Sequence, residues 1–320
     1  MGTLLEVKDL KKYFPTPSGV LHAVDGVSFT VNEGETLGVV GESGCGKSTL
    51  GRVILHLLDI TGGSIYFCGQ DITNVSKKEL RKLREDMQII FQDPFSSLNP
   101  RMTIAEAIAE PLIISGSFSK AEVDNRVKEL MDTVGLSARL VNTYPHELDG
   151  GRRQRIGIAR ALALNPKFIV CDEPVSALDV SIQAQILNLM QDLQEQLGLT
   201  YIFITHDMSV VKYISHHICV MYLGQLIEKS PSNELFAKPY HPYTKALLSA
   251  IPLPDIHSKT ERILLKGELT SPIDPKPGCR FCQRCLYAKE ICSQKEPELQ
   301  EVEPGHFVAC HLTKEINQMH

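Results

Sequence analysis

The sequence predicts an α/β fold in which helices cover a largely parallel sheet. Short apolar runs typical of buried strands alternate with amphipathic helical segments, and a glycine-rich loop joins one such run to the helix after it. The 320 residues suffice for one large or two modest domains, and 43% hydrophobic and 22% charged residues are ordinary for a globular protein.

The glycine-rich loop, residues 41–48, fits G-x-x-x-x-G-K-[ST] at every specified position. It follows the apolar run 36–40 and precedes the helical segment 49–58, which is the strand–loop–helix context that this motif requires. Its glycines let backbone N–H groups wrap around phosphates at the positive end of a helix. Lys47 can then reach the β- and γ-phosphates, and the Ser48 hydroxyl can ligate Mg²⁺.

A chance match of this motif is expected only about 0.01 times in a chain of this composition. The sequence therefore predicts a P-loop that binds a nucleoside triphosphate. The residues predicted to contact the nucleotide at this loop are Gly41, Glu42, Ser43, Gly44, Cys45, Gly46, Lys47, Ser48 and Thr49.

The other elements of the first half follow from apolar pattern and turn residues. Four strands are predicted, at 4–10, 22–31, 64–68 and 87–91. A basic helical stretch precedes the last of them, and a loop with two prolines, 92–100, follows it. From residue 103 to about 140 the pattern is helical, and the helical block of about 96–160 is expected to be inserted into the α/β core.

The second half continues the alternation. Helices are predicted at 156–164 and 182–197, and strands at 167–171 and 201–205. Residues 218–222 and 225–228 are predicted to form a hairpin around Gly224. We expect this nucleotide-binding core to occupy residues 1–230 and an extension to occupy 231–320.

An acidic pair follows the predicted strand 167–171. Asp172 and Glu173 should therefore emerge at the carboxyl end of that strand, where α/β sheets bind ligands. Asp172 is suited to hold Mg²⁺, usually through water, and Glu173 is suited to polarise an attacking water as general base. Adjacent acids in a loop are weak evidence alone, but downstream of a complete phosphate loop they are strong evidence.

Composition excludes some classes. A net charge of −5 and a pI near 6.1 argue against a nucleic-acid partner. No window approaches the ~18 apolar residues of a membrane span, and no signal peptide is predicted. Five of the nine cysteines cluster near the C-terminus, which favours a metal site over disulfides in a chain without an export signal.

In chain order, these motifs resemble those of an ABC-transporter ATPase. Lys47 and Ser48 correspond to Walker A, Gln92 to the Q-loop, residues 148–152 to the signature, and Asp172 with Glu173 to Walker B. Residues 176–179 resemble the D-loop and His206 the H-loop. The resemblance covers about residues 4–230 and implies a P-loop NTPase fold with an inserted helical subdomain and an antiparallel β subdomain.

The resemblance also implies roles. ABC ATPases dimerise head to tail, so Asp149, Gly150 and Gly151 of the signature would face the partner's ATP, and Asp179 would cross the interface. Gln92 would sense the γ-phosphate, join Ser48 and Asp172 at Mg²⁺, and link to the transmembrane partner. His206 would contact the γ-phosphate. Phe14 falls where the family's adenine-stacking aromatic lies, with Tyr13 as its rival.

The signature departs from the typical Leu-Ser-Gly-Gly-Gln, because Asp149 and Arg152 replace the serine and glutamine. An ionised Asp149 cannot donate to a phosphate, and at ~4 Å with an effective dielectric near 20 each like-charge pair costs ~4 kcal/mol. Arg152 could offset this, or Asp149 could simply cap the helix. We hypothesise that the site formed by this signature is slower or only structural, while the site with Lys47, Glu173 and His206 is competent.

The tail, residues 231–320, resembles the C-terminal extension of ATPases that serve dipeptide, oligopeptide and nickel importers. Within that group, the whole chain resembles the F-type ATPase subunit. The family pattern implies a [4Fe–4S] cluster on Cys279, Cys285, Cys292 and Cys310, with Cys282 as an extra or substitute ligand. Spacing alone leaves Zn²⁺ open as the alternative. Of the remaining cysteines, Cys45 is expected to be exposed enough for alkylation. The strand-core cysteines are expected to be Cys68, Cys171 and Cys219.

The resemblance implies an ATP-hydrolysing subunit, peripheral on the cytoplasmic face of the cell membrane, that powers peptide import. Its partners would be a second ATPase subunit, two permeases and an extracytoplasmic peptide-binding protein, with membrane contact only through the permeases. The coupling surface would lie near Gln92 and residues 93–115. Nickel and oligosaccharides stay open as cargo. The alternatives are a soluble ABC ATPase not coupled to transport and a non-hydrolysing regulatory subunit.

Overall fold

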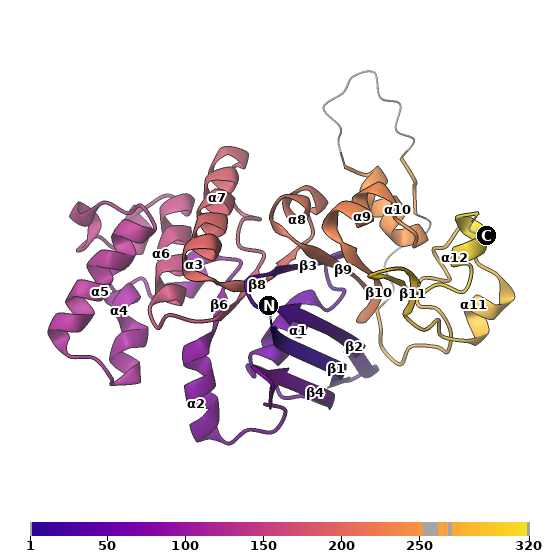
Figure 1. Ribbon diagram of the computed structural model, residues 1–320, viewed down its shortest axis with the longest axis horizontal. Coiled ribbons are helices and arrows are strands. Elements are labelled where there is room, and N and C mark those ends of the chain that lie inside the picture. The colour runs from indigo at the N-terminus through magenta and orange to yellow at the C-terminus, as the bar shows by residue number, and fades with distance from the viewer. Residues whose placement is uncertain (1, 252–261, 266, 268–270, 319–320) are drawn as a thin grey trace. The chain divides into compact units, whose positions relative to one another are not determined.

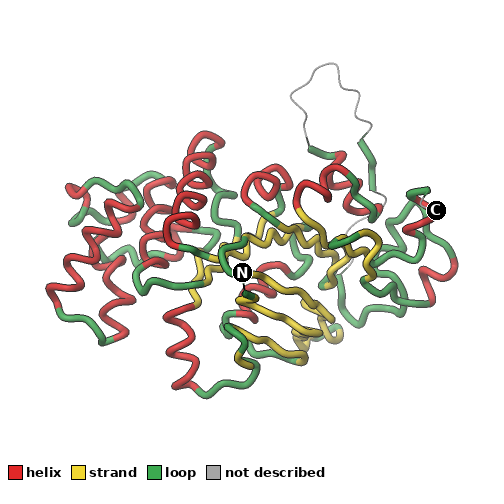
Figure 2. Tube along the Cα trace, in the orientation of Figure 1, coloured by secondary structure: helices red, strands yellow, loops and turns green. Residues whose placement is uncertain are grey.

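The computed structural model describes residues 2–251, 262–265, 267 and 271–318 (Figure 1). The chain divides into two compact units. The first unit combines Met1–Asn74 with Ile204–His320, and the second is Val75–Phe203. Helices, strands and loops are distinguished along the chain in Figure 2. Within the described residues, no helix has both the length and the apolar character to cross a bilayer.

The first unit contains an antiparallel sheet with the strand order β2-β1-β4-β5. These strands are β1 (Thr3–Thr16), β2 (Gly19–Asn32), β4 (Gly62–Phe67) and β5 (Gln70–Asp71). β1 and β2 are longer than predicted, because pairing continues to Thr16 and Gly19 across the expected turn. The tight turn needs Gly19 at φ 132°, a region that residues with a Cβ rarely adopt. The antiparallel β subdomain predicted from the resemblance is therefore present.

The main sheet of the first unit has the order β11-β12-β10-β9-β3. β3 (Thr36–Val40) is buried throughout and runs parallel to β9 (His217–Tyr222). β10 (Gln225–Pro231) pairs antiparallel with β9, so the hairpin predicted around Gly224 is confirmed. β8 (Thr200–Thr205) crosses the boundary between the units.

Helix α1 (Lys47–Ile54) follows the phosphate loop, and α8 (Met208–Ile214) packs on β3. Gly38 permits this packing, since a Cβ there would lie 2.4 Å from Val211 Cγ1. α1 is shorter than the predicted 49–58, because His56 takes a positive φ and the N–H groups of Leu57 and Leu58 turn back to the Arg52 carbonyl.

The described part of the chain beyond residue 230 packs within the first unit. It contains α9 (Ser232–Ala237), α10 (Pro242–Ser249), α11 (Glu290–Gln294), β11 (Gln300–Glu303), β12 (His306–Val308) and α12 (Thr313–Ile316). β12 pairs with β10, with Val308 opposite Glu228. Tyr243 and Phe281 are buried and join a cluster with Tyr222. The extension thus shares a core with the unit that carries the phosphate loop.

The second unit pairs β6 (Met87–Ile90) in parallel with β7 (Phe168–Asp172). Its helices are α2 (Lys77–Asp86), α3 (Pro94–Ser97), α4 (Ile104–Ser115), α5 (Lys120–Thr133), α6 (Gly150–Leu162) and α7 (Val180–Leu197). Two short 3₁₀ turns, Ala138–Leu140 and Pro145–Glu147, precede α6. Ser76, Thr103 and Ser119 begin α2, α4 and α5 with capping boxes, each with a glutamate three residues later.

The region predicted to be helical from 103 to 140 breaks at Gly116, which ends α4 in the left-handed conformation. α4 and α5 pack on each other and on α6. The predicted boundaries of the inserted helical block and of the extension at 230 stay predictions.

A buried carboxylate joins β10 to the extension. Glu228 has no exposed surface and accepts the N–H groups of Tyr240 at 2.7 Å and His241 at 3.0 Å. His306 Nε2 lies 2.8 Å from the same carboxylate. Burial lowers the pKa of His241 to about 4, although the charge of Glu228 acts in the opposite direction.

This pKa predicts a pH-dependent stability. The His241 pKa lies near 6.5 in the unfolded chain and about 4 in the folded protein, so unfolding takes up a proton between these values. Stability should therefore fall as pH drops from about 6.5 towards 4, by up to about 3 kcal/mol from this group. In His241→Asn, the free energy of unfolding from urea titrations should lose that part of its pH dependence.

Asparagine is the matched replacement. His241 Nδ1 accepts the Tyr243 N–H at 3.1 Å at the start of α10, and asparagine can make the same cap. His306 is present in both proteins and cancels in the comparison. Parallel stability curves for the two proteins between pH 7 and 4.5 would contradict the assignment.

Candidate nucleotide-binding site

The phosphate loop connects β3 to α1 and depends on two glycines (Figure 1). Gly41 has φ 153° and Gly46 has φ 102°. A Cβ on Gly41 would stand 2.2 Å from the Met221 carbonyl oxygen, and one on Gly46 would stand 2.0 Å from the Ala23 carbonyl oxygen. Main-chain atoms cannot shift enough to relieve such a clash, so only glycine fits at these two positions. The loop thereby keeps the backbone conformation that surrounds a phosphate.

Lys47 folds back over this loop. Its side chain is buried, and Nζ donates to the carbonyl oxygens of Gly41 at 2.8 Å and Glu42 at 3.0 Å. The amine is thus held against the loop mainly by two of the loop's own carbonyl groups. An anionic phosphate is a stronger partner for an ammonium group than a carbonyl.

Cys45 corrects one expectation. Only 1% of this residue is exposed, and its Sγ lies 3.8 Å from Lys47 Nζ. Burial raises the pKa of the thiol despite the nearby charge of Lys47, so the prediction that it is open to alkylation is wrong. Cys171 and Cys219 are buried as predicted, but Cys68 is exposed because it lies in the turn after β4 at φ 50°.

The aromatics predicted for adenine lie in the β1–β2 hairpin. Phe14 is half-buried and pairs with Leu21, and Lys12 Nζ lies 4.9 Å from the centre of its ring. Tyr13 instead donates its hydroxyl to Asp25 and stacks on the His22 ring at 4.0 Å between centroids. Because Tyr13 already has these partners, Phe14 stays the predicted adenine contact.

In the second unit, β7 ends at the predicted Walker B pair. Asp172 is buried, and Glu173 takes the left-handed conformation at φ 49°, a strained geometry for a residue with a side chain. Gln92 Nε2 donates to Glu173 Oε2 at 3.0 Å. The structure therefore joins the residues predicted as γ-phosphate sensor and general base. The amide donor fixes the direction of the Glu173 carboxylate.

The signature aspartate is the N-cap of α6. Asp149 Oδ1 accepts the Arg152 N–H at 2.8 Å, and Arg152 Nε lies 3.4 Å from Oδ2. Both side chains are about half exposed. The capping role and the charge offset weighed from sequence are therefore both present. Gly150 and Gly151 form the first turn of α6, where a Cβ on Gly151 would lie 2.6 Å from Ile182 Cγ2.

The other predicted residues take simple positions. Asp179 precedes α7 and is exposed, and His206 follows β8 and is exposed. The phosphate loop and His206 belong to the first unit, and Gln92, Asp149, Asp172, Glu173 and Asp179 belong to the second. The roles predicted for these residues stay predictions.

Of the tail cysteines, Cys279, Cys282 and Cys285 lie in a turn-rich segment, Cys292 lies in α11 and Cys310 follows β12. The Cys279 N–H donates to the Cys292 carbonyl at 2.7 Å, and the Cys282 N–H to the Cys279 carbonyl at 3.0 Å. Burial raises the pKa of Cys279 to about 12, and the charges of Cys310, Cys292 and Cys285 add to this. Within the described residues, no group of three or more His, Cys, Asp or Glu side chains is arranged to hold a metal ion.

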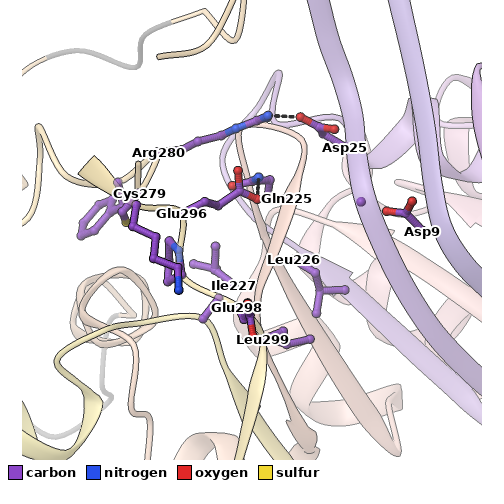
Figure 3. A pocket seen from close by; sticks show the side chains of 15 residues that line it. Asp9, Asp25, Gln225, Leu226, Ile227, Cys279, Arg280, Glu296, Glu298 and Leu299 are labelled. Atoms are coloured by element: carbon purple, nitrogen blue, oxygen red, sulfur yellow. Dashed lines mark hydrogen bonds and ion pairs between the residues drawn. The ribbon is translucent and has the colours of Figure 1, made fainter. Parts of the chain in front are cut away.

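A cavity of about 450 Å³ is lined by residues of the β1–β2 hairpin, β10 and the extension (Figure 3). Asp9 and Asp25 line it from the hairpin, and Arg280 and Glu296 from the extension. Gln225 Nε2 donates to Glu296 Oε1 at 2.6 Å at its edge. It lies apart from the phosphate loop and contains no predicted site residue except Cys279.

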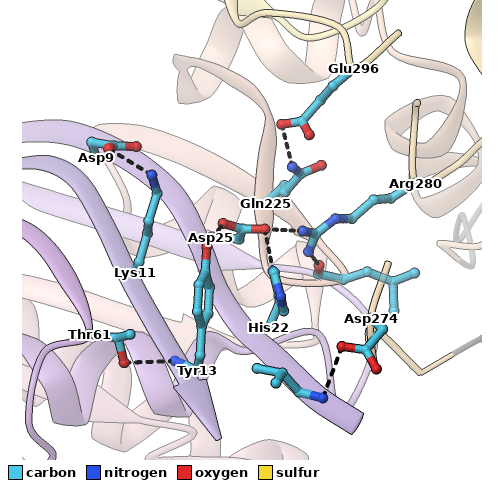
Figure 4. A network of polar contacts seen from close by, with 12 residues as sticks. Asp9, Lys11, Tyr13, His22, Asp25, Thr61, Gln225, Asp274, Arg280 and Glu296 are labelled. Atoms are coloured by element: carbon cyan, nitrogen blue, oxygen red, sulfur yellow. Dashed lines mark hydrogen bonds and ion pairs between the residues drawn. The ribbon is translucent and has the colours of Figure 1, made fainter. Parts of the chain in front are cut away.

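Sequence reasoning missed a polar network that includes this Arg280 (Figure 4). Arg280 donates to the Asp25 carboxylate and to the Leu223 carbonyl. Burial acts to raise the pKa of Asp25, but bonds from Tyr13 and His22 and the charge of Arg280 outweigh it and lower that pKa. The only sequence signal was two arginines interleaved with the cysteines.

The second of these arginines reaches the phosphate loop. Arg284 donates through its two terminal nitrogens to Glu42, at 2.6 Å to Oε2 and 3.1 Å to Oε1. The Glu42 N–H donates to the Tyr243 hydroxyl at 2.8 Å. Glu42 occupies a variable position of the motif, so its partners could not be predicted.

Comparison with known proteins identifies the family. Residues 24–176 match the ABC transporter family, and residues 227–292 match the oligopeptide/dipeptide transporter C-terminal region. The chain is 54% identical to the oligopeptide transport ATP-binding protein AppF of Bacillus subtilis (strain 168), covering 97% of each chain. The chain belongs to the ABC-type ATPases. It carries the C-terminal region of the oligopeptide/dipeptide transporter family.

Other matches agree. The ABC ATPase is 53% identical to OppF of Salmonella typhimurium (strain LT2), which is named an oligopeptide transport ATP-binding protein, over 95% of this chain and 92% of that one. It superposes on one chain of the ADP- and Pi-bound dimer of the ATP-binding cassette MJ0796 with a TM-score of 0.66 and 31% identity, over 72% of this chain and 99% of that one. It also superposes on CbiO1 of Clostridium perfringens with a TM-score of 0.67 and 29% identity, over 74% of this chain and 92% of that one.

These findings confirm the predicted family, the P-loop ABC fold and the ATPase class. ATP and Mg²⁺ are the ligands expected of such an ATPase, whose hydrolysis of ATP is coupled to transport. The glycine positions that exclude a Cβ, with Lys47 beside them, fit that expectation.

Proposed function

We propose that this ABC ATPase powers the import of peptides through a membrane transporter. The observation that carries the proposal is that one chain contains both a complete ATP-binding cassette and the oligopeptide/dipeptide C-terminal region. Relatives covering nearly the whole chain are named oligopeptide or peptide import ATP-binding proteins. The C-terminal region disfavours the alternative of a soluble ABC ATPase not coupled to transport. Nickel or an oligosaccharide is the alternative cargo within this class.

In this proposal, the loop from Gly41 to Ser48 holds the phosphates of ATP through its backbone N–H groups. Lys47 exchanges its carbonyl partners for phosphate oxygens. Ser48, Asp172 and Gln92 would hold Mg²⁺, which neutralises charge on the phosphate oxygens. Phe14 stacks on the adenine.

Glu173 is the proposed general base, and the Gln92 amide orients its carboxylate. His206 contacts the γ-phosphate. These residues make the site built on this chain's own phosphate loop competent for hydrolysis, which disfavours the alternative of a non-hydrolysing regulatory subunit.

We expect Glu173→Gln to lower steady-state ATP hydrolysis by about 10²–10⁴-fold, because proton transfer to a positioned base is lost. The affinity for MgATP should change little, since the phosphate loop is untouched. Glu195→Gln, the same substitution at an exposed position of α7, is the matched control. Equal turnover by Glu173→Gln and the wild type would contradict the assignment of the base.

The proposed assembly contains a second ATPase subunit, two permeases and an extracytoplasmic peptide-binding protein. The chain would lie on the cytoplasmic face of the cell membrane and touch the membrane only through the permeases. The surface near Gln92 and residues 93–115 would meet the permeases. In the head-to-tail dimer, this chain's signature would complete the partner's ATP site, and Asp179 would cross the interface.

The signature then makes the two ATP sites unequal. Asp149 brings a carboxylate to the place of a hydroxyl donor, and its bond to Arg152 only partly offsets the charge, because both side chains are exposed to solvent. In complexes whose subunit carries Glu173→Gln, only the site with this signature should turn over. In that background, Asp149→Ser should raise turnover about tenfold, equivalent to about 1.4 kcal/mol.

Asp149→Asn is the matched control for the Asp149→Ser experiment, because asparagine caps a helix as well as aspartate but carries no charge. If charge is the cause, this variant should also turn over faster. Unchanged turnover in Asp149→Ser would refute the proposed inequality of the sites.

We also propose that Cys279, Cys285, Cys292 and Cys310 bind a [4Fe–4S] cluster, with Cys282 as an extra or substitute ligand. The clustering of five cysteines between residues 279 and 310 and the shared chemistry of thiolate ligands support a metal site, and Zn²⁺ is the alternative. Anaerobically purified protein should contain about four iron and four sulfide, with broad absorption at about 400 nm. One zinc per chain without sulfide would favour the zinc site over the cluster. Protein that contains neither iron nor zinc would refute the proposed metal site.

A further inference from the structure

The C-terminal extension holds the phosphate loop through contacts to Glu42. Glu42, the second residue of the loop, has its N–H bonded to the Tyr243 hydroxyl of α10 and its carboxylate bonded to Arg284. Neither partner belongs to the ATP-binding cassette matched at residues 24–176.

The Arg284–Glu42 pair is a strong contact. Two N–H···O bonds join the groups, and the Arg284 side chain is only 10% exposed and that of Glu42 30%. A bidentate pair shielded from water has both directionality and strength that an exposed ion pair lacks. It therefore restricts where the second residue of the loop can lie.

An aromatic support holds Arg284 in place. Its guanidinium lies 5.9 Å from the centre of the Tyr222 ring, and Tyr222 meets Tyr243 and Phe281 edge to face at 4.8 Å and 5.2 Å between centroids. All three rings are buried. The Arg284 side chain consequently has little freedom to move unless these packed rings, two of them in the extension, also move.

The contact continues to Lys47, the phosphate-binding lysine proposed for the loop. The Glu42 carbonyl accepts Lys47 Nζ, so the residue that Arg284 holds also positions the ammonium group. A displaced Glu42 would move the carbonyl that orients Lys47. Its carboxylate, if unpaired, would add a negative charge beside the phosphates.

The second arginine of the same segment supports the neighbouring turn. Arg280 binds the Leu223 carbonyl, and the next residue, Gly224, donates its N–H to the Cys45 carbonyl at 2.8 Å. Both arginines lie among Cys279, Cys282 and Cys285, whose turns set their direction.

We propose that Arg284 is a positioning residue for the phosphate loop, through which the cysteine-rich segment sets the affinity for nucleotide. Any change that disorders residues 279–292 then weakens nucleotide binding without touching the loop. This inference rests on the proposed binding of MgATP at residues 41–48.

The test compares dissociation constants for MgATP and MgADP, measured on the full-length chain by calorimetry. Arg284→Gln should weaken both about tenfold, because the loop holds phosphates common to the two nucleotides. The matched control is Lys289→Gln, which breaks an exposed ion pair between Lys289 and Glu315 in the same extension and should bind as the wild type does. Arg284→Lys should recover part of the loss.

A double variant separates positioning from loss of stability. In Arg284→Gln with Glu42→Gln, the uncompensated carboxylate is gone, so the protein should bind nucleotide more tightly than Arg284→Gln alone. A general loss of stability predicts the reverse, and melting temperatures record it separately. If Arg284→Gln does not fold, Glu42→Gln with wild-type Arg284 interrupts the same pair and should change both dissociation constants.

An Arg284→Gln protein that binds both nucleotides as the wild type does overturns the inference and leaves the proposed function standing. A double variant no tighter than Arg284→Gln alone overturns it as well. Failure of the wild type to bind MgATP refutes the proposed function itself, so the two failures are distinguishable.

Discussion

The phosphate loop depends on a steric constraint, since at two of its glycines a single added carbon would collide with main chain. The obstructing carbonyls, those of Met221 and Ala23, come from segments far away in sequence. The loop is therefore shaped by its surroundings and stands ready to hold a phosphate before any nucleotide arrives. Lys47, held meanwhile by carbonyls of the same loop, keeps its positive charge at the place where the anion will lie. Little reorganisation is needed on binding, which favours affinity.

The C-terminal extension belongs to this arrangement as much as the cassette does. It shares an aromatic core with β9 through Tyr222, Tyr243 and Phe281, and a buried carboxylate with β10 through Glu228. Two backbone N–H groups and the imidazole of His306 hydrogen-bond to the Glu228 carboxylate, which would otherwise be costly to bury. Such a core transmits displacement, because close-packed side chains cannot shift singly. A displacement in the extension should therefore also displace the phosphate loop.

The sequence was informative where a local pattern determines structure. Gly41 to Ser48 could be read because spacing and residue type alone identify a phosphate loop, and the hairpin at Gly224 because turn residues separate two apolar runs. The burial of Cys45 and the exposure of Cys68 could not be read, since each depends on the conformation of one turn. The bond between Gln92 and Glu173 joins residues far apart in sequence. Arg284 and Glu42 are still further apart, and neither carries a local signal.

The pairing of β12 with β10 has a consequence for how the chain is divided in the laboratory. β10 would otherwise be the outer strand of its sheet, with open N–H and C=O groups. Open edges recruit strands from other molecules and lead to aggregation, and proteins commonly cover them. A cassette trimmed before residue 306 would lose that cover together with the imidazole beside Glu228. Insolubility of such a fragment would then reflect the exposed edge of β10. It would not show that the cassette fails to fold in the full-length chain.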